Sequence, residues 1–187
     1  LDLRTLERIS RLSPGDTLLD MLAVREINKL EEKYLSKTLP AGDASFAYNY
    51  YYNEKDSASV KEVKETAAWM QWMTEQKTTK HPSLYATGAA YLHYIAKDYS
   101  EARKWLQAAR EKGVKGALAD QWQLTELLIT INEQPSIDQA FEAKILPTLQ
   151  WLEGKARKDH NALGYYADGP WTKFYRNLMN SVIAPRH

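Results

Sequence analysis

Apolar residues recur every three or four positions along most of the chain, a spacing that places them on one face of an α-helix. The clearest stripe follows Asp16, which can cap a helix by accepting hydrogen bonds from its free N–H groups. The stripe consists of Leu19, Ala23, Ile27, Leu30 and Tyr34. Glu26, Glu31 and Glu32 fall off it, as expected of a solvent-facing side, and Leu39 to Gly42 breaks the pattern.

Residues that start and stop helices divide the rest of the chain. Three pairs match a capping box, in which two side chains satisfy each other's backbone N–H groups: Ser59 with Glu62, Asp98 with Glu101, and Ser136 with Gln139. Pro82 suits the first turn of another helix. The predicted helices cover residues 3–12, 17–38, a stretch from Ser59, a stretch from Pro82, 98–113, 118–131, a stretch from Ser136 that kinks or restarts at Pro147, and 171–182.

Residues 82–113 are predicted to form two short antiparallel helices. The first contains Gly88-Ala89-Ala90-Tyr91, and the second runs Asp98-Tyr99-Ser100-Glu101-Ala102-Arg103-Lys104-Trp105-Leu106-Gln107-Ala108-Ala109. This segment resembles one tetratricopeptide-type repeat, with matches at Tyr99, Ala102, Leu106 and Ala109. His93 stands where the family has an aromatic residue. The resemblance implies that small residues let the two helices approach closely and that the tyrosine in the turn packs between them.

A second, weaker copy of the same pattern covers residues 117–152, around Ile137, Asp138, Gln139 and Ala140. The resemblance implies helical layers stacked into a curved scaffold, which in this family commonly offers a concave surface to a peptide or protein. We therefore expect an all-α fold of antiparallel helical hairpins, stacked as a tetratricopeptide-like right-handed solenoid or as a bundle. The length of 187 residues suits a single domain spanning 1–187.

Composition narrows the classes of partner. The chain has 25 Lys plus Arg against 24 Asp plus Glu, so it lacks the basic excess that attracts nucleic acid. No apolar run approaches the roughly 20 residues of a membrane span, so we expect a soluble chain. It has no cysteine, which excludes disulfides and thiolate metal sites but leaves the compartment open. Because it begins without Met, we expect a mature form or an excised piece of a longer protein.

Catalytic and metal-binding motifs are missing from the sequence. The four histidines, at positions 81, 93, 160 and 187, do not have the spacing of metal ligands. Glu31 and Glu32 sit side by side on one predicted helix, whereas glycosidase chemistry needs two carboxylates across a cleft. There is also no nucleophile elbow and no phosphate-binding glycine loop. We therefore predict that the protein is not an enzyme and needs no metal or cofactor.

Aromatic side chains are the remaining candidates for binding. Residues 41–58 form the least helical stretch, and its centre is Tyr48, Asn49, Tyr50, Tyr51, Tyr52 and Asn53. In a loop, such residues can stack on sugar or peptide and donate amide hydrogen bonds. The alternative is that alternate tyrosines pack the loop onto neighbouring helices.

Tyr165, Tyr166 and Trp171 form a second aromatic group with the same two alternatives. The cluster Trp69 to Met73 either lines a ligand groove or, as its helical spacing favours, belongs to the core.

Two functional hypotheses follow. The first is a non-catalytic helical-repeat module that binds another protein or a peptide, because hairpins resembling repeats are present and catalytic spacings are absent. The alternative is an aromatic-lined glycan or small-ligand binding domain of a bacterial cell-envelope protein, based on the tyrosine-rich loop.

Overall fold

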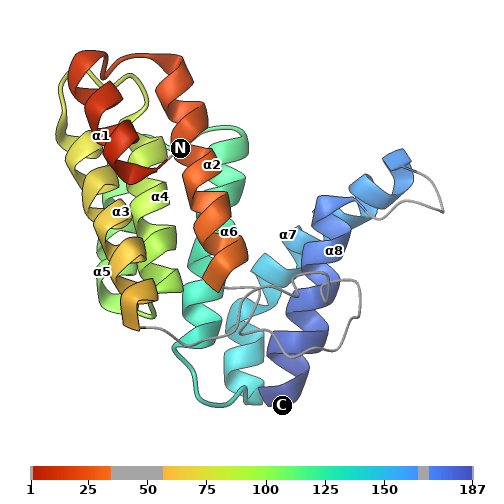
Figure 1. Ribbon diagram of the computed structural model, residues 1–187. Helices are drawn as coiled ribbons and strands as arrows, with labels where there is room; N and C mark the ends of the chain where they lie inside the picture. Colours follow the sequence, from red (N-terminus) through yellow and green to blue (C-terminus); the bar gives the residue numbers. More distant parts are fainter. Residues whose placement is uncertain (1, 35–56, 164–168, 187) are drawn as a thin grey trace. The chain divides into compact units, whose positions relative to one another are not determined.

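The computed structural model describes residues 2–34, 57–163 and 169–186, and within these ranges every regular element is a helix (Figure 1). The prediction of an all-α fold is confirmed. The helices are α1 (Leu3–Leu12), α2 (Thr17–Tyr34), α3 (Ser57–Glu75), α4 (Pro82–Ile95), α5 (Tyr99–Glu111), α6 (Ala117–Asn132), α7 (Gln139–Leu163) and α8 (Pro170–Asn177). A π-helical turn, Leu178–Ile183, and a 3₁₀ turn, Ala184–Arg186, follow α8.

The chain divides into two compact units, with a boundary inside α6. Unit 1 contains α1 to α5 and α6 as far as Ile129, and unit 2 contains the end of α6 with α7, α8 and the C-terminal turns. The expectation that all 187 residues fold as one domain stays a prediction.

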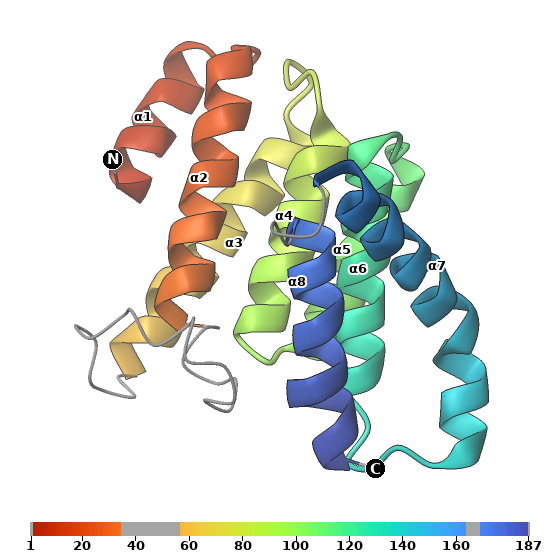
Figure 2. The ribbon, with the colours of Figure 1, turned by 90° about the vertical axis from the view of Figure 1, so that its right-hand side faces the viewer.

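Helix α4 is the centre of unit 1 because almost its whole surface is buried. It packs against α2, α3 and α5, while α1 packs against α2 and α3. The two views agree that α1 and α2 lie together on one side of α3 and α4 (Figures 1 and 2). The buried core of this region consists of Leu6, Leu19, Ala23, Leu30, Val63, Ala67, Trp69, Met70, Met73, Tyr85, Ala89 and Leu92.

The stripe predicted on α2 is buried as expected at Leu19, Ala23 and Leu30, but the acidic side is less solvated than predicted. Glu26 is only 4% exposed and forms an ion pair with Lys29 at 2.8 Å. Glu31 is half-buried and accepts a hydrogen bond from the buried Tyr91, and burial raises its pKa above the usual value. The prediction of a fully solvated face is therefore wrong at these two positions.

The predicted hairpin of residues 82–113 appears as α4 and α5, joined by only three residues. The predicted cap is present, since Asp98 Oδ1 accepts from the backbone N–H of Glu101 at 3.3 Å. On α5 the predicted inner face is buried at Ala102, Leu106 and Ala109. The ring of Tyr99 lies 6.2 Å from that of Tyr94 on α4, so this tyrosine does pack at the turn between the two helices.

Gly88 allows α4 to approach its neighbours closely, but these neighbours are α2 and α3, which lie outside the hairpin. A Cβ added at Gly88 would lie 2.9 Å from Ile27 Cδ1 on α2 and 2.9 Å from Met70 Sδ on α3. The face of α4 that carries Gly88 therefore packs against α2 and α3. The missing side chain leaves the room that Ile27 and Met70 occupy.

One detail of α7 differs from the sequence prediction. Its N-cap is Asp138 and not Ser136, because Asp138 Oδ1 accepts from the backbone N–H of Phe141 at 2.8 Å. Of the two outcomes predicted at Pro147, the restart does not occur, because the helix continues through this residue, and the kink stays a prediction.

Unit 2 is held together by contacts between α7, α8 and the C-terminal turns. The Trp151 ring on α7 meets the Trp171 ring on α8 edge to face, with centroids 5.9 Å apart. Asp159 of α7 accepts from the backbone N–H of Trp171 at 3.0 Å and so caps α8. Arg186 donates to the carbonyl of Ile131 at 3.1 Å and to Asn132 Oδ1 at 2.8 Å. The latter contacts fix the C-terminal turn to the end of α6.

The burial of His93, near the end of α4, leads us to predict that the stability of the fold depends on pH. It is 8% exposed, and its Nε2 lies 2.7 Å from Gln71 Nε2. Burial lowers its pKa below the ordinary 6.5, against the opposing effect of Asp98 and Glu101; Lys64 and Lys104 lower it further. Below about pH 6.5 the unfolded chain therefore binds a proton that the folded chain does not, and folding loses stability as the pH falls.

We expect the free energy of unfolding of the wild type to fall more steeply between pH 7 and pH 5 than that of His93→Gln, which keeps an amide able to bond Gln71. Urea unfolding at a series of pH values measures both slopes. Because all other titrating groups are shared, the difference between the two curves reports on His93. Parallel curves would contradict the prediction.

Candidate functional site

The aromatic and amide residues predicted as a binding site, Tyr48, Asn49, Tyr50, Tyr51, Tyr52 and Asn53, lie outside the described residues, as do Tyr165 and Tyr166. Their role stays a prediction. Within the described ranges, no group of three or more His, Cys, Asp or Glu side chains is placed to hold a metal ion. None of the helices searched is long and apolar enough to cross a membrane.

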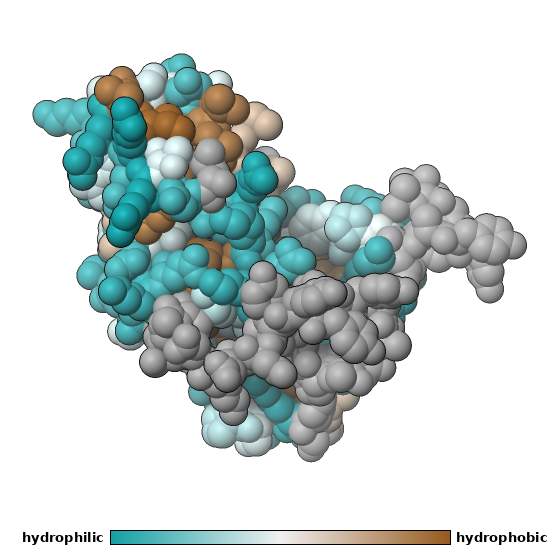
Figure 3. All heavy atoms as spheres, viewed as in Figure 1, coloured by the Kyte–Doolittle hydropathy of each residue, from teal (hydrophilic) through white to brown (hydrophobic). Residues whose placement is uncertain are grey.

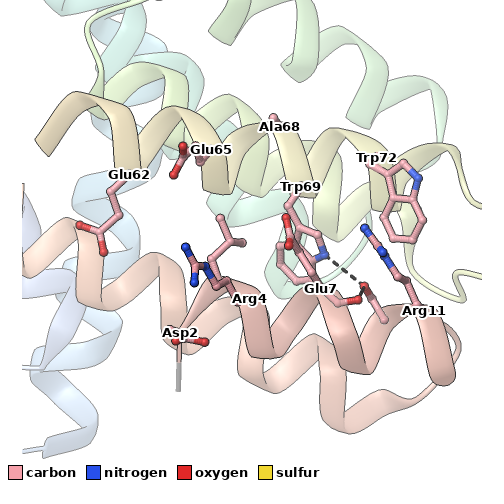
Figure 4. A pocket seen from close by; sticks show the side chains of 11 residues that line it. Asp2, Arg4, Glu7, Arg11, Glu62, Glu65, Ala68, Trp69 and Trp72 are labelled. Carbon is pink, nitrogen blue, oxygen red and sulfur yellow. Dashed lines mark hydrogen bonds between the residues drawn. The ribbon is translucent and has the colours of Figure 1, made fainter. Parts of the chain in front are cut away.

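The structure instead shows a groove in unit 1, between α1 and α3, with a volume of about 870 Å³ (Figure 4). We call it the α1–α3 groove. Its lining combines carboxylates, guanidinium groups and indole rings, and consists of Asp2, Leu3, Arg4, Glu7, Ser10, Arg11, Glu62, Glu65, Ala68, Trp69 and Trp72.

Helix periodicity explains why α1 can form one wall of the groove. Leu6 and Ser10, four residues apart, are buried and anchor the helix to the core. Arg4 and Arg11 are seven residues, or about two turns, apart and share a neighbouring face. The two helices run in the same direction along the groove, so that Asp2 lies at the Glu62 end and Arg11 at the Trp72 end (Figure 4).

The floor of the groove is Trp69, which several contacts hold in place. Its Nε1 donates to Ser10 Oγ at 3.3 Å (Figure 4), and its ring meets that of Tyr85 edge to face with centroids 5.9 Å apart. The Tyr85 hydroxyl in turn donates to Asp20 Oδ1 at 2.8 Å, while Asp20 Oδ2 lies 2.6 Å from His81 Nδ1. The indole at the floor is therefore fixed by residues of α1, α2 and α4.

One end of the groove is acidic, with Asp2, the N-cap of α1, and with Glu62 and Glu65 on α3. Thr5 donates to Asp2 through both its hydroxyl and its backbone N–H, and these bonds hold the pKa of Asp2 below its usual value. Partial burial alone would raise the pKa of Glu62, but hydrogen bonds from Lys33 and Tyr34, each 2.6 Å long, outweigh it and lower the pKa. The lowered pKa values favour the ionised form of Asp2 and Glu62.

The other end of the groove is basic and aromatic. The ring of Trp72 is 41% exposed, and the guanidinium of Arg11 lies beside it (Figure 4). Arg11 is exposed and forms no ion pair with any residue in the described ranges. The unmatched charge at the Trp72 end is thus positive.

Carboxylates, guanidinium groups and indole rings dominate the lining, and hydroxyl chemistry is limited to one side chain. The one hydroxyl in the lining, on Ser10, is fully buried, donates to the Glu7 carbonyl at 2.9 Å and accepts from Trp69. It is therefore not paired with a base, as a nucleophile would be. No histidine is among the residues that line the groove.

The sequence interpretation treated Trp69 to Met73 as one group, either core or groove, whereas the structure divides it. Trp69, Met70 and Met73 are buried in the core, and Trp72, with one edge of Trp69, lines the groove. The arginines Arg4 and Arg11 were not singled out at all. Their two-turn spacing on a short amphipathic helix is a signal in the sequence, but its partner wall on α3 could not be inferred from it.

Apolar side chains also gather where α1 meets α2, visible as a brown area on the surface at that end (Figure 3). Leu12, Leu18 and Met21 are the most exposed large hydrophobic residues there, at 79%, 56% and 69%. They do not line the α1–α3 groove. They therefore serve as matched surface controls for it.

No protein-family model, no curated protein and no solved structure matches this chain.

Proposed function

We propose that the protein is a non-catalytic helical-repeat module that binds a peptide or a segment of another protein in the α1–α3 groove. The observation that carries the proposal is Trp72. A large indole ring that is 41% exposed lies at the edge of a groove whose floor is a second, fully fixed indole, Trp69. Exposed tryptophan and arginine side chains beside a cavity are the residues that most often dominate protein binding energy.

The dimensions of the groove support a short extended ligand. Helix α1 has 10 residues and is therefore about 15 Å long. An extended peptide advances about 3.3 Å per residue, so four or five residues would span this wall. The volume of about 870 Å³ also falls in the range of about 300–1,000 Å³ typical of ligand sites.

The proposed architecture is a tetratricopeptide-like right-handed stack of hairpins. The short turn between α4 and α5, the buried small residues of α5 and the packing of α3 against α4 support it. In such a stack each hairpin contacts its neighbours, and surfaces between helices are used for binding. Residues 117–152 would contribute the weaker second copy.

The proposal is tested by probing an array of random 12-residue peptides, and in parallel a glycan array, with the labelled full-length chain. We expect binding to peptides, and we expect Trp72→Ala to weaken it at least tenfold, about 1.4 kcal/mol. Met21→Ala, which removes an apolar side chain that is 69% exposed and lies outside the groove, should bind as the wild type does.

Unchanged peptide binding by Trp72→Ala would exclude the groove as the site. Binding to glycans without binding to peptides would instead support an aromatic-lined carbohydrate-binding domain, and would direct attention to Tyr48–Asn53.

A further inference from the structure

We infer that the α1–α3 groove selects a bipolar segment, with an acidic and an apolar side chain at the Arg11–Trp72 end and a basic side chain at the Asp2–Glu65 end. This inference rests on the proposed function, because it specifies the ligand class of the same groove. It goes beyond that function by assigning a charge and a position to each end of the ligand.

The Arg11–Trp72 end is suited to a carboxylate next to an apolar group. Arg11 is exposed, extends from α1 toward α3 with its guanidinium beside the Trp72 ring, and has no ion-pair partner among the described residues (Figure 4). A guanidinium binds a carboxylate through two parallel hydrogen bonds, a geometry that a lysine ammonium does not offer. The adjacent indole face gives an apolar or aromatic ligand side chain a surface to pack on.

Three carboxylates line the opposite end. Asp2 lies on the α1 side and Glu62 and Glu65 on α3, with Arg4, Lys33 and Lys61 as nearby cations. Glu62 is engaged by Lys33 at 2.6 Å, whereas the ion pair of Glu65 with Lys61 is long, at 3.8 Å, and both of its side chains are more than half exposed. Such an exposed pair is weak. Glu65 and the second oxygen of Asp2 are thus available to a basic side chain.

The distance between the two ends sets the spacing of the ligand charges. Asp2 and Arg11 are nine residues apart, and at 1.5 Å per residue they lie about 13 Å apart along α1. Four steps of an extended chain cover the same distance. A basic residue and an acidic residue four positions apart would therefore reach the two ends at once.

A ligand whose two charges have the same sign would meet repulsion at one end of the groove. A peptide with two acidic residues would place one of them against Asp2, Glu62 and Glu65, and a peptide with two basic residues would place one against Arg11. Unfavourable juxtapositions of this kind give an interface specificity as much as attractive ones do.

The test uses short amidated and acetylated peptides with a zwitterionic rhodamine label, whose binding to the full-length chain is followed by fluorescence anisotropy. The bipolar probe is Lys-Ala-Ala-Phe-Asp. The comparison probes are Asp-Ala-Ala-Phe-Asp, Lys-Ala-Ala-Phe-Lys, and Ala-Ala-Lys-Phe-Asp, in which the two charges are too close together. We expect the bipolar probe to bind at least tenfold more tightly than each of the other three.

Charge reversal supplies the decisive variant. Arg11→Glu should lose the preference for the bipolar probe and bind Lys-Ala-Ala-Phe-Lys more tightly than the wild type does. Arg8→Glu makes the same charge change on the same helix at an exposed residue outside the groove lining, and should keep the wild-type preference. Circular dichroism verifies that both variants remain helical.

The outcomes separate this inference from the function on which it rests. If all four probes bind equally and Trp72→Ala abolishes binding, the groove binds peptides but the charge order is wrong. An unchanged preference in Arg11→Glu also overturns the charge order. If no probe binds the wild type up to millimolar concentration and the peptide array is silent, both proposals fail.

Discussion

Replacing Trp69 with alanine is expected to lower the free energy of unfolding by about 3–5 kcal/mol, the range for truncating a buried aromatic residue. Trp69 is 4% exposed, so the substitution opens a cavity in the core of unit 1. It also removes the hydrogen bond to Ser10, which holds α1, and the edge-to-face contact with Tyr85 of α4. Equilibrium unfolding in urea, followed by far-ultraviolet circular dichroism, measures the change.

Trp72→Ala is the matched control, because it removes the same side chain three residues further along α3. Its ring is 41% exposed, so we expect a loss of stability below about 1 kcal/mol. The two variants should therefore dissociate stability from binding: Trp69→Ala impairs folding, and Trp72→Ala impairs binding alone. Equal losses of stability would show that Trp72 is a core residue and that the α1–α3 groove is closed.

Gly88→Leu is expected to cost about 1–3 kcal/mol, the range for forcing extra atoms into a packed core. Even the first added atom would lie 2.9 Å from both Ile27 Cδ1 and Met70 Sδ, and the branched end of leucine has nowhere to go between α2 and α3. Gly88→Ala should be close to neutral. Both neighbours are ends of flexible side chains that can yield, and alanine gains up to about 1 kcal/mol of helix propensity over glycine.

A double-mutant cycle tests whether the cost arises at this contact. Ile27→Val deletes the Cδ1 atom that faces Gly88, so the pair Gly88→Leu with Ile27→Val should be more stable than the sum of the two single changes predicts. Thermal and urea denaturation of the four proteins gives the interaction energy. Strict additivity would place the clash elsewhere.

Local rules in the sequence accounted for the helices well, because capping and periodicity act over one or two turns. Asp16 and Asp98 cap the helices that their positions predict, with the Asp16 carboxylate accepting from the N–H of Leu18 at 2.9 Å. The error at α7 was also local. Ser136 and Asp138 are both capping residues two positions apart, and only the backbone conformation decides which of them closes the helix.

Features that depend on packing between distant segments could not be inferred in the same way. The sequence suggested that Gly88 makes its close contact within its own hairpin. Its neighbours are instead Ile27, 61 positions away along the chain, and Met70, 18 positions away. Likewise, the groove forms because Ser10 meets Trp69 across 59 positions. Periodicity identifies which face of a helix is buried but not which helix covers it.

Glu26 and Glu31 illustrate the same limit for polar residues. Their charge suggested solvent, but each has a partner that allows burial: Lys29 one turn away for Glu26, and the Tyr91 hydroxyl of α4 for Glu31. A carboxylate is buried only when such a partner is present. The first partner was visible in the sequence at helical spacing, and the second was not.

Helix α1, which forms one wall of the groove, can open independently of the rest of unit 1. A helix of 10 residues is too short to persist on its own in water, so α1 stays formed only while Leu6 and Ser10 remain packed against its neighbours. Local opening of α1 would remove the binding site without unfolding the rest of unit 1. The observed affinity for a ligand would then equal the intrinsic affinity multiplied by the fraction of molecules in which α1 is docked. A ligand in the groove would in turn slow the hydrogen exchange of the α1 amides. The exchange rate of these amides would therefore report how much of the groove is occupied.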